Sequence, residues 1–167
     1  MTVQSKQAVE ILDVGGAVMK TLATPGDVVS VPSNKKPFSI RVTFNIPEIK
    51  ATVVTGDYTP VQNSKSFSFL VESTSERYLP QDYVPGKLTF PAPNVVRFDL
   101  AFGEFQAFFA GKYKVTLFAI ADPTPGINRP AISSQSDSSP LDGQPELVFP
   151  TGDGVPGGSF VCQFVVT

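Results

Sequence analysis

Residues 38–46 have the sequence FSIRVTFNI, in which apolar and polar side chains alternate without interruption. Successive side chains of a β-strand point to opposite faces, so this period of two predicts a strand with one buried face and one solvated face. Half-buried strands of this kind are typical of antiparallel sheets. The stretch therefore indicates a β-structured core.

Four further stretches repeat the alternation, and five others carry a weaker form of it. No stretch keeps the apolar spacing of an amphipathic helix, so we expect at most a turn or two of helix. Short strands separated by Gly and Pro predict an all-β fold, a single antiparallel β-sandwich of about seven to ten strands, with a jelly roll as the alternative. The clear stretches are residues 66–71, 96–102, 112–119 and 160–166, and the weaker ones are residues 8–14, 17–22, 28–31, 51–55 and 87–90.

Composition limits the functions that such a sandwich can have. The chain has 167 residues, 41% of them hydrophobic and 17% charged, which predicts one domain over residues 1–167. A net charge of −2 argues against a nucleic-acid partner bound through its phosphates. The absence of histidine and tryptophan, with a single cysteine, excludes histidine acid/base catalysis and disulfides within the chain, and argues against zinc or copper sites. We expect no catalytic residues, no cofactor and no metal.

The chain contains no apolar run long enough for a transmembrane segment. Its first six residues are polar, and no signal peptide is visible. The localisation stays open between the cytoplasm, an assembled particle, and a mature secreted form with an added methionine.

Residues 121–158 predict one long Gly/Pro-rich loop before the last strand. Thirteen of the 29 Gly and Pro residues fall there, together with five acidic side chains and a single arginine, Arg129. Loops of this length within compact domains are usually functional or disordered. Asp137 and Asp142 are therefore candidate interaction residues. They could also contribute oxygen ligands to Ca²⁺, although their spacing matches no calcium-binding motif.

The sequence AGKYKVTL at residues 110–117 resembles the penultimate strand of immunoglobulin-like and fibronectin type III-like sandwiches. The resemblance implies that Tyr113 forms a tyrosine corner, in which the hydroxyl bonds to a nearby loop. It also implies that residues 160–166 are the final strand and residues 38–46 an early one. The cysteine pair and core tryptophan of antibody domains are missing. The resemblance is to a superfold, which leaves the function open.

Phenylalanines are concentrated in residues 102–110, just before that strand. Their spacing fits neither a strand nor a helix, so one face cannot hide them all. We expect a loop that closes the end of the sandwich, with Phe105 or Phe108 as the plug. The alternatives are an exposed patch for a partner protein, formed by Phe105, Phe108 and Phe109, and a tip that dips into a membrane.

Other candidate groups are weaker. Tyr78 and Tyr83 flank Pro80 and could stack against a carbohydrate. Cys162 shares a strand face with Phe160 and Phe164 and is expected to be a buried, unreactive thiol. Glycoside hydrolysis needs two carboxylates across a cleft, and Asp99 and Glu104 are the nearest such pair on a structured segment. The simpler interpretation of Asp99 is an exposed charge beside Arg97.

These observations favour a non-enzymatic structural or protein-interaction module, either an assembly subunit or a domain that presents its loops. Its partner would be another protein or further copies of the same chain, as in a virion, an injection apparatus or a surface fibre. The alternative is a module that binds a carbohydrate or a Ca²⁺-dependent ligand. An enzyme that works with carboxylates alone is the third hypothesis.

Overall fold

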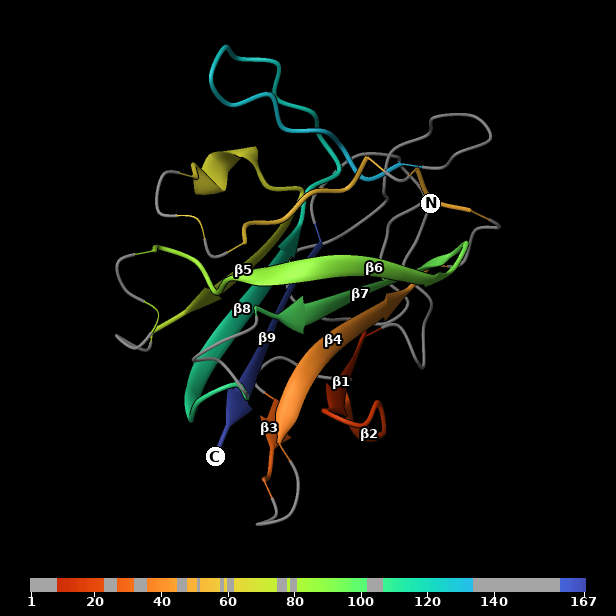
Figure 1. Cartoon of the computed structure of the whole chain (residues 1–167), viewed down its shortest axis with the longest axis vertical. Helices are drawn as coiled ribbons and strands as arrows, with labels where there is room; N and C mark the ends of the chain where they lie inside the picture. The colour runs from red at the N-terminus through yellow and green to blue at the C-terminus, as the bar shows by residue number, and fades with distance from the viewer. Residues whose placement is uncertain are drawn as a thin grey trace.

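The structure is a computed structural model in which residues 9–22, 27–31, 36–44, 48–50, 52–57, 59, 62–74, 78, 81–101, 107–133 and 160–167 are described. This part of the chain forms nine strands and one short 3₁₀ helix (Figure 1). None of its helical residues forms a segment that could cross a bilayer. The elements are β1 (Val9–Asp13), β2 (Val18–Thr21), β3 (Asp27–Val29), β4 (Pro37–Thr43), η1 (Ser64–Ser66), β5 (Phe69–Ser73), β6 (Gly86–Ala92), β7 (Val95–Leu100), β8 (Gly111–Leu117) and β9 (Phe160–Val166).

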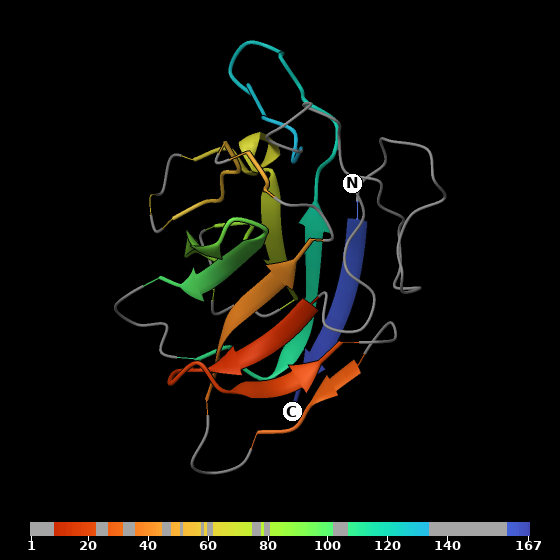
Figure 2. The ribbon, with the colours of Figure 1, turned by 90° about the vertical axis from the view of Figure 1, so that its right-hand side faces the viewer.

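The strands form two sheets that pack face to face, which confirms the predicted all-β sandwich. One sheet has the order β2-β1-β4-β7-β6 and the other β3-β9-β8-β5. The described pairs are antiparallel, apart from β3, which runs parallel to β9. Figure 2 shows the two layers from the side, with β8 and β9 of one sheet on the right and β6 and β7 of the other on the left. Each sheet therefore combines strands that lie far apart in the sequence.

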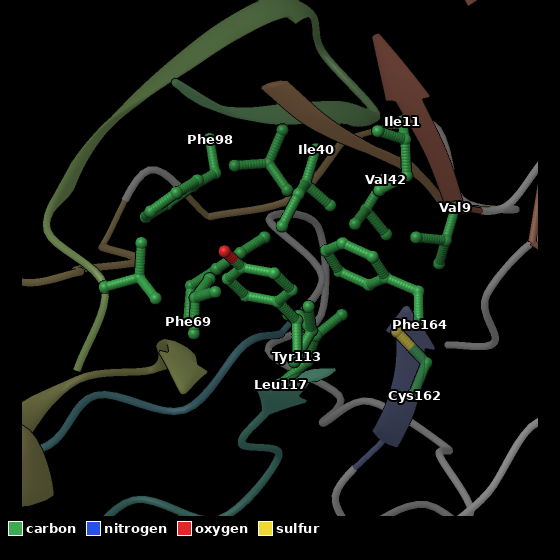
Figure 3. Packing of buried hydrophobic residues seen from close by; sticks show 14 of the residues in the cluster. Val9, Ile11, Ile40, Val42, Phe69, Phe98, Tyr113, Leu117, Cys162 and Phe164 are labelled. Carbon is green, nitrogen blue, oxygen red and sulfur yellow. The ribbon is translucent and has the colours of Figure 1, made fainter. Parts of the chain in front are cut away.

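The alternating side chains line the interior, as the sequence predicts. In the five-stranded sheet Ile40 pairs with Phe98, and both are fully buried. In the four-stranded sheet Val115 pairs with Cys162, and these are equally buried. The two inner faces meet in one hydrophobic core (Figure 3). Full burial of each large apolar side chain contributes about 1.5–3 kcal/mol.

Aromatic rings join the two sheets across this core. The rings of Phe98 in β7 and Phe69 in β5 stack with centroids 5.7 Å apart. Tyr113 in β8 stacks on Phe164 in β9 at 5.1 Å. Phe108 contacts Phe98, Tyr113 and Phe164. Phe108 thus fills the end of the core beside β8, which is the plugging role that the sequence suggested for it.

The outer face of the five-stranded sheet carries paired charges. Arg41 of β4 donates two hydrogen bonds to one carboxylate oxygen of Glu10 in β1, at 2.9 and 2.7 Å. On β7 Arg97 forms an ion pair with Asp99, and Asp99 also accepts a hydrogen bond from Ser39 at 2.5 Å. Asp99 therefore lies beside Arg97 as expected, but its side chain is only 21% exposed. Pairing is required because an isolated carboxylate is costly to remove from water.

Two strand predictions need correction. Residues 52–55 of the predicted strand 51–55 do not form one, because Val54 bonds through its carbonyl to the amides of Ser68 and Phe69 instead of pairing in a ladder. Ser39 was placed in water by the alternation, but it is buried through its contact with Asp99. Both differences arise from contacts between residues distant in sequence, which a local pattern does not contain.

Gly86, at the start of β6, gives a direct test of the core. A Cβ atom at this position would lie 2.2 Å from Cζ of Phe98 and 2.7 Å from the carbonyl oxygen of Asp99. We expect Gly86→Ala to lower the free energy of unfolding by about 1–3 kcal/mol through overpacking, measured by urea denaturation.

Gly15→Ala is the matched control. Its nearest heavy atom would be a carboxylate oxygen of Asp13 at 3.4 Å, an ordinary contact distance. This variant should stay within about 0.5 kcal/mol of the wild type. Equal stability of the two variants would contradict the close approach of β6 to Phe98.

Candidate functional site

The chain continues beyond β8 as a hydrogen-bonded loop that protrudes from one end of the sandwich (Figures 1 and 2). The amide of Ile132 donates to the carbonyl of Phe118 at 2.9 Å, and Asp122 and Arg129 exchange two backbone hydrogen bonds. A turn closes the tip, where Asn128 has a φ of 45°, in the left-handed region. Ile132 is fully buried in the core and anchors the base of the loop. Residues 118–133 therefore form an ordered unit, which we call the protruding loop.

Residues 121–133 of the protruding loop are the first third of the long segment predicted at residues 121–158. Residues 134–159, with the candidate interaction residues Asp137 and Asp142, lie outside the described residues.

A second segment, made of the described residues 52–57, 59 and 62–66, lies beside the protruding loop. Its position is set by the bonds from Ser68 and Phe69 to the carbonyl of Val54, and by the hydroxyl of Thr55, which donates to the carbonyl of Phe69 at 2.6 Å. It ends in η1, where the side chain of Asn63 accepts a hydrogen bond from the amide of Lys65 at 3.0 Å. Backbone bonds to β5 thus hold this segment against the loop.

An open groove of about 600 Å³ runs between these two segments, and we call it the loop-end groove. Its walls are largely apolar, and Val54 is among the few large hydrophobic side chains that the described surface exposes. A mostly apolar concavity with a few polar groups is the usual form of a binding site. The lining residues are Thr52, Val54, Ser66, Ala121, Asp122, Pro123, Asn128, Arg129 and Pro130.

Arg129 is the cation of this groove. Its guanidinium carbon lies 4.0 Å from the centre of the Phe118 ring, a cation–π contact. Its nitrogens donate to the carbonyl oxygens of Ile120 and Lys65, each at 3.4 Å. These acceptors are neutral, so they orient the side chain without cancelling its charge.

Asp122 supplies the acidic side chain of the groove wall. Hydrogen bonds from the side chain and backbone of Thr124 lower the pKa of this carboxyl, and the positive charges of Arg129 and Lys65 lower it further. Its carboxylate accepts the amide of Thr124 at 3.0 Å and so closes its own turn. The carboxylate is therefore committed to the loop itself.

The charged groups in the described lining of the groove are the carboxylate of Asp122 and the guanidinium of Arg129. Elsewhere among the described residues, no three His, Cys, Asp or Glu side chains are close enough to share a metal ion. The chemistry that this part of the chain offers is an apolar surface with one oriented guanidinium.

The Phe-rich segment is only partly described. Phe108 is 3% exposed, and Phe109 is half-buried against Tyr78. Phe108 is thus not available to a partner, which corrects the alternative of an exposed patch at this residue. Phe105 lies outside the described residues.

The two tyrosines considered for carbohydrate stacking are also buried. Tyr78 and Tyr83 are each 3% exposed. The hydroxyl of Tyr83 lies within hydrogen-bonding distance of the carbonyls of Asp57 and Thr59 and the side chain of Gln62. Its ring packs edge-on against Phe67 at 4.9 Å. Neither tyrosine presents a face to a sugar, so the structure corrects that expectation.

Tyr78 instead joins Tyr113 in a buried network at the start of β8. The Tyr113 hydroxyl donates to the carbonyl of Phe109 at 2.6 Å, four residues upstream. Because that bond uses its only proton, Tyr78 donates in the 2.9 Å contact between the two hydroxyls. Burial and the contact with Tyr78 raise the pKa of Tyr113. The local bond implied for Tyr113 by the immunoglobulin-like resemblance is therefore present.

Cys162 lies in the core between the sheets (Figure 3). Burial raises the pKa of its thiol to about 12. A thiol that stays protonated and covered is a poor nucleophile, in agreement with the expectation of an unreactive residue.

The groove was not predicted from the sequence. Arg129 was visible as the single cation of an acidic, Gly/Pro-rich segment, and this was the one available signal. Val54 was assigned to a strand, and no pattern linked it to residues seventy positions further along the chain. Comparison with protein-family models, curated proteins and solved structures finds no match to this chain.

The tyrosine network yields a stability prediction. Tyr113→Phe would leave the Phe109 carbonyl without its donor, so we expect a loss of about 1–3 kcal/mol of unfolding free energy, measured by urea denaturation. The loss in Tyr78→Phe/Tyr113→Phe should be smaller than the sum of the two single losses, because the hydroxyls share one contact. Additive losses would show that the two hydroxyls act independently.

Cys162 yields a pH prediction. The folded protein keeps the thiol protonated up to a pKa of about 12, whereas the unfolded chain ionises near the ordinary value of 9.0. Ionisation therefore favours unfolding, and the stability contributed by this thiol is lost as the pH rises from about 9 to about 12. Wild type should lose up to about 1.4 kcal/mol per pH unit more than Cys162→Ala in this window. Parallel stability curves for the two proteins would contradict the burial of the thiol.

Proposed function

We propose that this chain is a non-enzymatic interaction module that binds a partner protein, or further copies of itself, through the loop-end groove. The observation that carries the proposal is an open, apolar groove with an oriented guanidinium, built on a loop tied to the core. Binding residues are commonly placed on loops that a rigid scaffold positions. Because Ile132 anchors the base of the loop in the core, the loop loses little conformational entropy when a partner binds.

We further propose that the sandwich is of the immunoglobulin-like type rather than a jelly roll. Support comes from the strand order, in which β1, β4, β7 and β6 occupy the positions of strands A, B, E and D, and β5, β8 and β9 those of C, F and G. These strands also follow that order along the chain, with β2 and β3 as additions. The bond from Tyr113 to the Phe109 carbonyl supports the same assignment, because it has the form of a tyrosine corner.

In that arrangement the two walls of the groove are the connections between strands B and C and between strands F and G. Variable antibody domains use these same connections in antigen binding. The analogy concerns architecture alone, and it supports the loop end as the interaction surface without naming a partner.

Val54 provides the test of this surface. Short random peptides would be displayed and selected against the wild-type protein, and the selected peptides would then be measured on Val54→Asp. We expect the aspartate to weaken binding by about tenfold or more, because it places a charge in the apolar wall. Light scattering over a concentration series on the same variant would show whether self-association uses the same surface.

Val18→Asp in β2 is the matched control. Val18 is 44% exposed and Val54 is 40% exposed, so the two substitutions alter similar valines at different places. Peptide binding should survive Val18→Asp. Peptides that bind Val54→Asp as well as wild type, together with unchanged self-association, would overturn the loop end as the interaction surface.

A further inference from the structure

We infer that the partner segment recognised by the loop-end groove carries a carboxylate beside apolar side chains, and that Arg129 binds this carboxylate. The inference rests on the proposed function and adds the chemistry of the occupant. The charge, the orientation and the surroundings of Arg129 support it.

Arg129 has no carboxylate of its own. Of the arginines in the described part of the chain, Arg41 pairs with Glu10 and Arg97 pairs with Asp99. No described carboxylate lies within ion-pairing distance of Arg129. The nearest acidic residue in its loop, Asp122, is engaged with Thr124. Among these three arginines Arg129 is therefore the one without an ion pair, and the carboxylate of Asp122 acts on its charge only from beyond ion-pairing distance.

The guanidinium is also held in place. One face of it rests on the Phe118 ring at 4.0 Å, and carbonyl oxygens of Ile120 and Lys65 accept from its nitrogens. The bonds to these carbonyls are long, at 3.4 Å, so a carboxylate could displace or share them at little cost. Stacking on an aromatic ring still leaves the edge of the planar group for a bidentate acceptor. An oriented arginine loses less side-chain entropy on binding than a mobile one.

The walls around Arg129 select for apolar neighbours of that carboxylate. Val54, Ala121, Pro123 and Pro130 line the groove, and they offer few donors or acceptors to a polar ligand. An ion pair beside apolar surface is screened less than one in open water. Lys65, whose charge reaches Asp122, adds a second cation near the same end. With Lys65 nearby, the two cations at this end outnumber the one described carboxylate of the groove wall, Asp122, which favours an acidic segment over a basic one.

The test uses the displayed random peptides as the probe, selected in parallel on wild type and on Arg129→Gln. We expect wild type to enrich peptides with Asp or Glu next to apolar residues, and Arg129→Gln to lose this enrichment. The best acidic peptide should bind wild type about two- to fivefold more tightly than its own amide analogue, in which the acid is replaced by Asn or Gln. On Arg129→Gln the two peptides should bind equally.

Two variants control the interpretation. Lys112→Gln removes an exposed cation on β8, away from the groove, and should leave the preference for the acidic peptide intact. Arg129→Lys keeps the charge without the planar fork and should retain only part of the preference. The loop itself should stay folded in these variants, because Asp122 and Arg129 are joined through their backbones.

The outcomes separate this inference from the function on which it rests. Peptides that lose binding on Val54→Asp but show no acidic preference would overturn the role of Arg129 and leave the groove as an interaction surface. Peptides that bind regardless of Val54→Asp would overturn both. If Arg129→Gln still preferred acidic peptides, another cation would bind the peptide carboxylate, and the inference would also be overturned.

Discussion

The stacked contact between Phe98 of β7 and Phe69 of β5 is the interaction on which the rest of the sandwich depends, because it joins two separately paired sheets across the core. Neither sheet could bury its inner face alone. Gly86 provides the space that the Phe98 ring occupies, and Phe108 extends the aromatic contacts toward Tyr113 and Phe164. The position of β8, and of the loop that follows it, is set by this packing.

The same packing explains why the loop end can hold a defined groove. The protruding loop leaves β8 directly and returns to the core at Ile132, while Val54 and Thr55 of the second segment are bonded to the start of β5. β5 and β8 are paired neighbours in one sheet. The two walls of the groove are therefore carried by adjacent strands, and the distance between them follows from the sheet rather than from contacts within the loops.

Charged side chains have different surroundings in two regions of the molecule. On the five-stranded sheet each described arginine meets a carboxylate, and the charges stabilise the pairing of neighbouring strands. At the loop end Arg129 donates to neutral carbonyls and rests on an aromatic face, and the carboxylate of Asp122 acts on it without forming an ion pair. A guanidinium without an ion pair is available to the carboxylate of a ligand, and the recognition role that we propose rests on this difference.

The sequence by itself determined the fold class and the inward faces, because a period of two in residues such as Ile40, Val42 and Phe98 requires one buried face per strand. It also indicated the local bond of Tyr113 and the inert state of Cys162. Tertiary structure alone decided the strand order, the burial of Tyr78 and Tyr83, and the meeting of Val54 with Arg129. These features depend on contacts between distant segments, and a local pattern carries no information about which segments will become neighbours.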